Sequence, residues 1–467
     1  MATSLTQELG AFVAGFDANA LPPEAAEVVR MGVIDTVGVM TVGQAEPGPG
    51  ILLATLRAAR EAPESRLFLG EERVSAPLAA LVNGTAAHVL DYDDVAMPLG
   101  GHPSTVLVPA ILAEADALPE ASGADMVAAY VAGYEVWAEL VRRDKDPHHS
   151  KGWHPTSIFG VVAAAAACAR LRGLDARGAA NAIAIAASGA CGVIANFGSM
   201  TKSFHAGRAA QAGLEAARLA ANGMDGSEDA IEHPGGFLAA LSPRGRTDRE
   251  SPATALGKDW RILEHRLDIK KYPMCYCVHR TLDAALDLLA EHPVKADQIA
   301  RIEARIGKLA SEILRNHRPQ TGLEAKFSIE FATASSVIAG RAGLAQLSDG
   351  FVGRGDVQEL MGRVEVVTTD AVEREGAILA PFDQVVLHLT DGTVLESAKV
   401  EKARGDATLP LGRAETWAKF EDCLTTAGHS AAEAAALFEA LEKLETLPSA
   451  AALPTLAGGA HRIAQTA

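Results

Sequence analysis

Residues 158–172 read IFGVVAAAAACARLR, and this stretch decides the class of fold. Alanine, leucine and arginine are among the strongest helix formers, so the run predicts a buried helix. Three other segments before residue 265 have similar composition and helical spacing: 23–42, 124–142 and 206–222. Their many alanines and glycines let helices approach closely. The first part of the chain is therefore predicted to consist of packed helices.

The character of the sequence changes after about residue 266. Alternating β-branched residues predict strands at 299–306, 364–367, 385–389 and 394–400. Asp391-Gly392 stands between the last two strands and predicts a hairpin. Helices predicted at 282–291 and 329–339 would cover this sheet, and a helical pattern returns over 414–447.

The predicted fold class is therefore mainly α with an α+β second domain. We expect a large helical domain in residues 1–265, a smaller α+β lid domain in 266–405, and C-terminal helices in 406–467 that rejoin the helical domain. A chain of 467 residues exceeds the size at which one hydrophobic core usually stops growing, and this favours two domains.

The composition argues against several classes of partner and location. A formal net charge of -17 repels phosphate backbones, so nucleic acid is not expected. The longest apolar stretch, 158–169, is far shorter than the ~20 residues that cross a bilayer, so no membrane association is expected. Five cysteines without framework spacing, and no recognisable leader, favour a reducing cytoplasm. An anionic substrate would need a local cluster of cations.

Histidine, lysine and aspartate gather in four polar islands, at residues 91–105, 152–157, 201–208 and 270–279. Long alanine-rich stretches separate these islands. Groups that titrate near neutrality are costly to bury unless they are paired or used, so such clusters indicate a functional site. We expect an enzyme whose islands converge around one hollow that excludes water.

The first island carries three carboxylates within four residues, Asp91, Asp93 and Asp94. Their mutual repulsion raises at least one pKa unless a cation or hydrogen-bond donors lie nearby, and a general base can be made this way. For Asp93 or Asp94 alone, the alternative is a helix end whose acids face water. For Asp91 together with His102, we favour a catalytic role.

Two corners of the sequence share one design, in which histidine precedes proline, a small hydroxyl residue and an apolar helix. They are His102-Pro103-Ser104 and His154-Pro155-Thr156. Proline is tolerated at a helix start, and backbone N–H groups bind anions there, so two such corners could hold two carboxylates. The alternative is two helix caps with incidental histidines.

The third and fourth islands supply cations. Lys202, His205 and Arg208 follow one another at intervals of three residues; Lys202 could neutralise a substrate carboxylate, and the alternative is a solvated helix start. The fourth island lies at the predicted domain junction, where it could line a cleft. Cys275 and Cys277 within it are expected to be buried structural thiols, because their spacing fits neither metal nor redox motifs.

No motif for a metal or a nucleotide cofactor is found in the sequence. His148 and His149 precede His154 without a helical His-x-x-x-His pair or a Cys-x-x-Cys, and no phosphate-binding glycine motif occurs. We therefore expect neither a cofactor nor a metal.

The chain resembles the MmgE/PrpD family, which includes 2-methylcitrate dehydratase, cis-aconitate decarboxylase and iminodisuccinate epimerase. The matching motifs, in chain order, are HVLDYDD at 88–94, GHPS at 101–104, GWHPT at 152–156, TKSFHAGRAAQAG at 201–213, KKYPMC with His279 at 270–279, and EAKFS at 324–328. The resemblance implies a cofactor-free enzyme, usually a homodimer, whose cleft lies between a helical domain and an α+β lid.

Transferred by motif, the resemblance implies the following site. Asp91, His102, His154 and Lys202 are the expected catalytic residues. The expected substrate-binding residues are His205, Arg208, Lys271, Tyr272, Cys275 and His279. In the decarboxylase branch, threonine, histidine and tyrosine stand where this chain has Val95, Cys275 and Phe331. These departures disfavour decarboxylation, which needs a proton donor at the carbon that loses CO2.

Together these observations predict a lyase that acts on a small anionic polycarboxylate. We expect removal of a proton next to a carboxylate, followed by loss of water, as in 2-methylcitrate dehydratase. Asp91 or His154 would be the base and His102 the acid, while Lys202 and Arg208 would hold carboxylates. Epimerisation and decarboxylation of related acids are the alternatives. A non-catalytic helical binding protein is a remote one.

Overall fold

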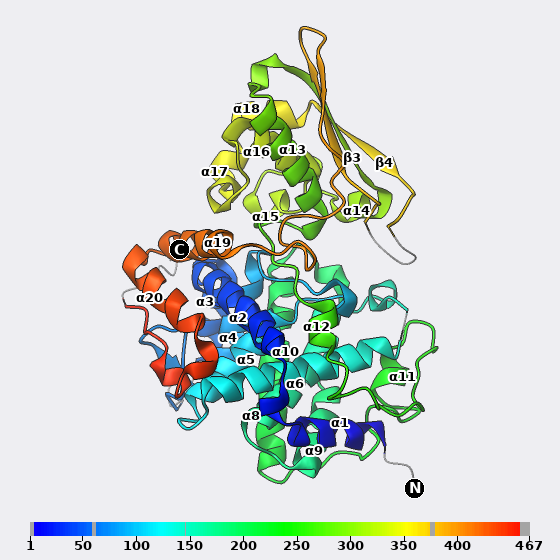
Figure 1. Cartoon of the computed structure of the whole chain (residues 1–467), viewed down its shortest axis with the longest axis vertical. Coiled ribbons are helices and arrows are strands. Elements are labelled where there is room, and N and C mark those ends of the chain that lie inside the picture. The colour runs from blue at the N-terminus through cyan, green and yellow to red at the C-terminus, as the bar shows by residue number, and fades with distance from the viewer. Residues whose placement is uncertain (1–3, 58–61, 145, 374–378, 458–467) are drawn as a thin grey trace. The chain divides into compact units, whose positions relative to one another are not determined.

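The computed structural model describes residues 4–57, 62–144, 146–373 and 379–457. Contacts divide the chain into two compact units, Met1–Asp268 with Gly412–Ala467, and Ile269–Leu411. The first unit is helical, and the second combines helices with a four-stranded sheet (Figure 1). The predicted fold class, mainly α with an α+β second domain, is confirmed. The sequence predicts a second domain over 266–405, and the second unit defined by contacts is Ile269–Leu411.

The helical unit contains long helices and one short hairpin of two-residue strands. Its helices are α1 (Leu5–Gly15), α2 (Pro23–Gly43), α3 (Pro47–Leu56), α4 (Ala76–Val89), α5 (Ser104–Asp116), α6 (Gly123–Arg142), α7 (Pro155–Ile158), α8 (Gly160–Leu171), α9 (Ala176–Ala187), α10 (Met200–Ala221), α11 (Phe237–Leu241), α12 (Arg261–His265), α19 (Arg413–Thr426) and α20 (Ala431–Leu441). The strands are β1 (Ser65–Arg66) and β2 (Arg73–Val74).

Helix α10 is central to this unit, because it contacts α4, α5, α8 and α9. Small residues make this packing possible. A Cβ added at Gly207 would lie 2.1 Å from the carbonyl oxygen of Leu81 on α4, and one at Gly213 would lie 2.6 Å from that of Val161 on α8. Only glycine fits at such close backbone approaches.

Most predicted helices are observed, with shifted ends. The stretch that predicts a helix over 158–172 forms α7 and α8, which meet at Phe159. The helix predicted from residue 206 begins six residues earlier, at Met200, because the Ser199 hydroxyl accepts the N–H of Thr201 and caps it. The C-terminal helices α19 and α20 pack on α2, from the opposite end of the chain.

The second unit is built on a sheet with strand order β4-β3-β5-β6. The strands are β3 (Ile299–Gly307), β4 (Val364–Thr369), β5 (Gln384–Leu389) and β6 (Val394–Glu396). Strands β3 and β4 are parallel, and the other pairs are antiparallel. The predicted hairpin between β5 and β6 is confirmed, with Gly392 in a left-handed conformation (φ +89°). Strand β6 is shorter than predicted.

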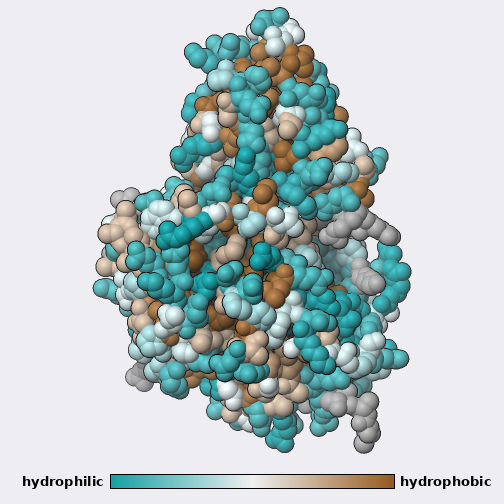
Figure 2. Space-filling view, viewed as in Figure 1, coloured by the Kyte–Doolittle hydropathy of each residue, from teal (hydrophilic) through white to brown (hydrophobic). Residues whose placement is uncertain are grey.

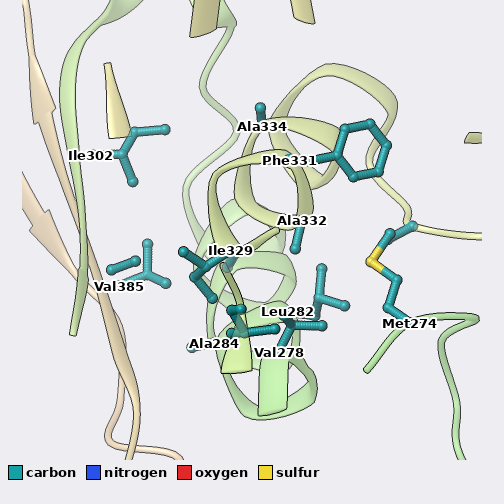
Figure 3. Packing of buried hydrophobic residues seen from close by; sticks show 14 of the residues in the cluster. Met274, Val278, Leu282, Ala284, Ile302, Ile329, Phe331, Ala332, Ala334 and Val385 are labelled. Atoms are coloured by element: carbon teal, nitrogen blue, oxygen red, sulfur yellow. The ribbon is translucent and has the colours of Figure 1, made fainter. Parts of the chain in front are cut away.

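Helices cover this sheet and close its core. They are α13 (His279–Glu291), α14 (Lys308–Ile313), α15 (Gly322–Ala325), α16 (Ile329–Ala339), α17 (Asp349–Val352) and α18 (Gly355–Met361). Helices α13 and α16 pack against each other and against the sheet. Figure 3 shows Ile302 and Val385 of the sheet facing Ile329 of α16. The amphipathic helices thus bury their apolar sides on the alternating apolar side chains of the strands.

Polar and apolar side chains are interspersed on the face of the molecule seen in Figure 2. Exposed large apolar residues, such as Ile51, Met200 and Val394, come from several different elements. Within the described ranges, none of the helices combines the length and the apolar character that a membrane crossing needs.

Candidate active site

Four histidines from separate parts of the helical unit come together. We call His88, His102, His154 and His205 the histidine cluster. The ring centroids of His88 and His102 are 4.5 Å apart, those of His88 and His154 5.9 Å, and those of His154 and His205 5.4 Å. His88 lies near the end of α4, and His205 is on α10. His102 stands two residues before the start of α5, and His154 directly precedes α7. Three of the four predicted islands therefore converge.

Asp91 and Lys202 form an ion pair with Nζ 2.8 Å from Oδ1. Both side chains are shielded from solvent, at 7% and 12% exposure. The backbone of Asp91 has a left-handed conformation (φ +53°), which is uncommon for a residue with a side chain. Such strain persists only where the surrounding structure enforces it, and it concentrates at functional sites. The structure therefore brings together the acid and the ammonium group that the sequence predicts for one site.

Asp93 is buried and contacts two members of the cluster. Its Oδ2 lies 2.9 Å from Nδ1 of His88 and 3.0 Å from Nδ1 of His102. Burial opposes ionisation of Asp93, but the two imidazoles outweigh it and hold the pKa of the carboxyl well below its usual range. Burial also lowers the pKa of His88 to about 4, so this ring is neutral at pH 7.

The two predicted histidine–proline corners meet. The backbone N–H of His102 donates to Oγ1 of Thr156, at 3.2 Å. Pro103 is the N-cap residue of α5, and Pro155 is the first residue of α7. Both prolines thus stand at helix starts, as predicted. At α5, however, the N–H of Ser104 already donates to the Asp94 carboxyl, at 3.4 Å, so the protein itself occupies part of this predicted anion site.

His154 and His205 face each other through their Nδ1 atoms, 3.2 Å apart. One ring must donate and the other accept, because two lone pairs or two N–H groups would repel. Burial, and then repulsion by neighbours that include the Lys202 ammonium, lowers the pKa of His154 well below its usual value. Burial also lowers the pKa of His205. Both rings are therefore neutral near pH 7, and His154 can accept a proton.

The alternative that Asp93 or Asp94 faces water is wrong, since both are fully buried. Burial, then the charges of Asp35 and Asp93, raises the pKa of Asp94 well above its usual value. Burial thus disfavours the charged form of one carboxyl of the island; the crowding of three acids predicts such a raised pKa, although desolvation is its larger cause.

Arg208 is not brought into the histidine cluster. Its guanidinium donates to Oε1 of Gln211, at 2.8 Å, and pairs with Glu215, at 3.8 Å. Its side chain is 42% exposed. The role of Arg208 as a carboxylate holder therefore stays a prediction without geometric support.

The residues of the fourth island belong to the second unit and are described within it. Lys271 and Tyr272 line a hollow of about 530 Å³ together with Arg341 and Arg404. The Tyr272 hydroxyl donates to Asp283, at 2.7 Å, and its ring makes an edge contact with His279. Cys275 and Cys277 are buried thiols, and no disulfide joins them. The substrate-binding roles of these residues stay predictions.

One group among the described residues has metal-ligand spacing. Single ligand atoms of His88, Asp91 and His102 lie within 4.8 Å of one another. The Lys202 ammonium is already 2.8 Å from the Asp91 carboxylate, and it would repel a divalent cation bound there. The donor set therefore fits an ammonium–carboxylate pair better than a metal centre.

The sequence alone predicts no role for His88 and does not distinguish Asp93 from Asp94. A signal was present, because His88, Asp91 and Asp93 belong to a single motif at the end of an alanine-rich helix. The contact of both residues with His102 depends on the fold, which returns the chain to this helix end after a loop of several residues.

Comparison with known proteins identifies the family of the chain. The sequence profile of the MmgE/PrpD N-terminal domain matches residues 7–250, and that of the MmgE/PrpD C-terminal domain matches residues 272–443. Cis-aconitate decarboxylase of Homo sapiens is 31% identical over 303 residues, which are 63% of this chain and 62% of the human protein, less than two thirds of its length. That of Mus musculus is 28% identical over 404 residues, covering 83% and 79%. That of Aspergillus terreus is 24% identical over 426 residues, covering 86% of each. The chain therefore belongs to the MmgE/PrpD family.

Proposed function

We propose that this protein is a lyase that removes a proton next to a carboxylate of a small polycarboxylic acid and then expels water. The observation that carries the proposal is the Asp91–Lys202 pair within the helical unit, together with the nearby histidine cluster. The chemistry needs a base, an acid and a fixed positive charge, and this group of side chains supplies all three.

Proton removal leaves negative charge on the carbon and on its neighbouring carboxylate. The shielded Lys202 ammonium is suited to stabilise that charge, because electrostatic interactions are stronger where water is excluded. Either the Asp91 carboxylate or the neutral His154 ring can take the proton. The electron pair of the broken C–H bond forms the alkene, and the hydroxyl group leaves with its bonding pair. A proton from His102 converts it to water.

His205 supports this assignment through its contact with His154. The two Nδ1 atoms are 3.2 Å apart, so His205 orients the ring that would accept the proton. We propose His205 as part of the substrate-binding site on this basis. The cofactor-free mechanism, the homodimer, the cytoplasmic location and closure of a lid over the substrate are further parts of the proposal.

Decarboxylation is the second candidate, favoured by the names of the relatives, which are cis-aconitate decarboxylases. In that reaction the bond to the departing carboxylate breaks, its electron pair stays on carbon, and a donor supplies a proton there. Val95, which is buried, and Phe331, which is buried in the core of the second unit, cannot supply that proton. Dehydration therefore leads. Epimerisation would need return of the proton on the opposite face.

The reaction can be identified by incubating the protein with citrate, 2-methylcitrate and cis-aconitate in D2O. Proton NMR would follow alkene formation and deuterium uptake, and CO2 release would be measured in parallel. Dehydration gives an alkene without CO2, decarboxylation gives CO2, and epimerisation gives deuterium in unreacted substrate without a new alkene. Turnover of none of these acids, with no binding of them in thermal-shift assays, would favour a non-catalytic binding protein.

A matched pair of variants tests the site itself. Lys202→Ala should lower kcat by about 10²–10³, the usual effect of removing one group that stabilises transition-state charge. Lys258→Ala removes an exposed lysine of the same unit and should leave kcat unchanged. Equal turnover by both variants would remove Lys202 from the mechanism.

A further inference from the structure

The Asp93 carboxylate lies between two imidazoles in the interior of the helical unit. One oxygen, Oδ2, is within hydrogen-bond distance of Nδ1 of both His88 and His102, at 2.9 and 3.0 Å. An ionised carboxylate only accepts hydrogen bonds, so each of these nitrogens carries a hydrogen. The contact thus determines the tautomer of both rings.

A second acceptor strengthens this conclusion for His102. The backbone carbonyl oxygen of Asp94 lies 2.7 Å from the same Nδ1 atom. Two acceptors that face one nitrogen leave no favourable place for a lone pair there. The neutral His102 ring is therefore protonated at Nδ1, and its lone pair is on Nε2, at the far side of the ring from Asp93.

We propose that Asp93 is a positioning residue, which holds His102 with Nε2 available for proton transfer and stabilises the ring when it carries a second proton. This inference rests on the proposed function, in which His102 transfers the proton. His88, bonded to the same carboxylate oxygen, keeps Asp93 in place. Neither Asp93 nor His88 needs to touch the substrate.

The neighbouring acids do not share this role. Asp91 is paired with Lys202, whereas the Asp94 carboxyl is directed to the N–H of Ser104. Burial raises the pKa of the Asp94 carboxyl well above its usual value, which disfavours the charged form that would stabilise an imidazolium. Asp93 places one carboxylate oxygen within hydrogen-bond distance of two rings of the cluster.

Asp93→Asn and Asp94→Asn are the matched variants. Asparagine at 93 can still offer one acceptor oxygen to the two N–H groups that now point at Oδ2, but it carries no negative charge, so a protonated His102 ring loses its ionised partner. We expect kcat of Asp93→Asn to fall at least about 10²-fold, with KM changed less than about threefold, on the acid that the native enzyme turns over. Asparagine at 94 keeps a side-chain oxygen that can accept the N–H of Ser104, so Asp94→Asn should keep the native kcat.

The pH profile separates positioning from a merely structural role. Other charged or titratable groups near the rings are Asp91, Lys202, His149, His154 and His205, and the variant leaves all of them in place. Loss of the Asp93 charge makes a protonated His102 ring less stable. The limb of the kcat profile on which His102 loses its proton should therefore move to lower pH. A smaller amount of folded enzyme would lower kcat without moving the limb. Native kcat and an unmoved limb in Asp93→Asn would overturn the proposal.

A measurement on the native protein keeps the proposal testable if Asp93→Asn does not fold or if no substrate is found. Nitrogen NMR of protein labelled with ¹⁵N-histidine distinguishes Nδ1–H from Nε2–H rings, and the variants His88→Gln and His102→Gln assign the two signals. We expect both rings as the Nδ1–H tautomer in native protein and in Asp94→Asn. An Nε2–H tautomer of native His102 would refute the inference, whether or not the protein is a lyase.

Discussion

The ion pair between Asp91 and Lys202 makes a quantitative prediction about stability. Lys202→Met would leave a carboxylate that is only 7% exposed without its ammonium partner, now 2.8 Å away. Removing one member of a buried pair typically costs about 3–5 kcal/mol, because the remaining charge stays desolvated. Since Lys202 is 12% exposed and some solvent reaches the pair, we expect a loss of about 3 kcal/mol in the free energy of unfolding.

A double-mutant cycle isolates the interaction. In Asp91→Asn/Lys202→Met neither of the two positions carries a charge, so the double variant should be more stable than Lys202→Met alone. We expect a coupling energy of about 2 kcal/mol between the two positions. The exposed pair Arg413–Glu442 provides the control, since its side chains are 70% and 28% exposed. Arg413→Met should cost at most about 1 kcal/mol.

Tryptophan fluorescence during urea unfolding is a suitable assay. All four tryptophans of the chain, at positions 137, 153, 260 and 417, lie in the helical unit, so their signal follows the unit that contains the pair. Strictly additive effects of the two substitutions would show that the charges do not interact. A loss in Lys202→Met no larger than that in Arg413→Met would refute the reasoning from burial.

Three further predictions concern pH and packing. The folded-state pKa of His88 and of His149 is lowered to about 4, mainly by burial, so the unfolded chain binds more protons below its ordinary histidine pKa of about 6.5. The free energy of unfolding of the helical unit should therefore be highest above pH 6.5 and should fall as the pH drops toward 4. Urea midpoints that do not change over this range would contradict the burial of neutral rings. The folded-state pKa of Asp94 is raised, so keeping an ionisable group at this position costs stability at pH 7, and Asp94→Asn should stabilise the unit there. This advantage should disappear below the ordinary aspartate pKa of about 3.9, where the carboxyl is protonated in the unfolded chain as well. Urea titrations of both proteins at pH 7 and below pH 3.9 would test this. Gly207→Ala should lower the free energy of unfolding by about 2 kcal/mol or more, because the added Cβ would lie 2.1 Å from the Leu81 carbonyl oxygen. In the control Gly50→Ala the added Cβ meets nothing within 4 Å, so this variant should be neutral or slightly stabilising in the same assay.

Local signals explain the parts of the fold that could be predicted. Periodicity over residues 23–42 and 329–339 placed α2 and α16, because the apolar positions of a helix repeat with its own turn. Asp391-Gly392 predicted the hairpin, since glycine readily adopts the left-handed conformation that its turn requires. Helix ends were less accurate, as the Ser199 cap of α10 illustrates, because a single side-chain hydrogen bond decides them.

The candidate site divides in the same way. The sequence alone determined that histidines, aspartates and a lysine are concentrated in islands between apolar helices, because the cost of burying such groups is a property of the residue type. Only the tertiary structure decided that Asp93 faces two imidazoles while the adjacent Asp94 carboxyl accepts from Ser104, and that Arg208 binds Gln211 and Glu215. Side-chain direction depends on the local backbone and on how the helices pack, and Asp93 and His102 meet only after the chain has folded.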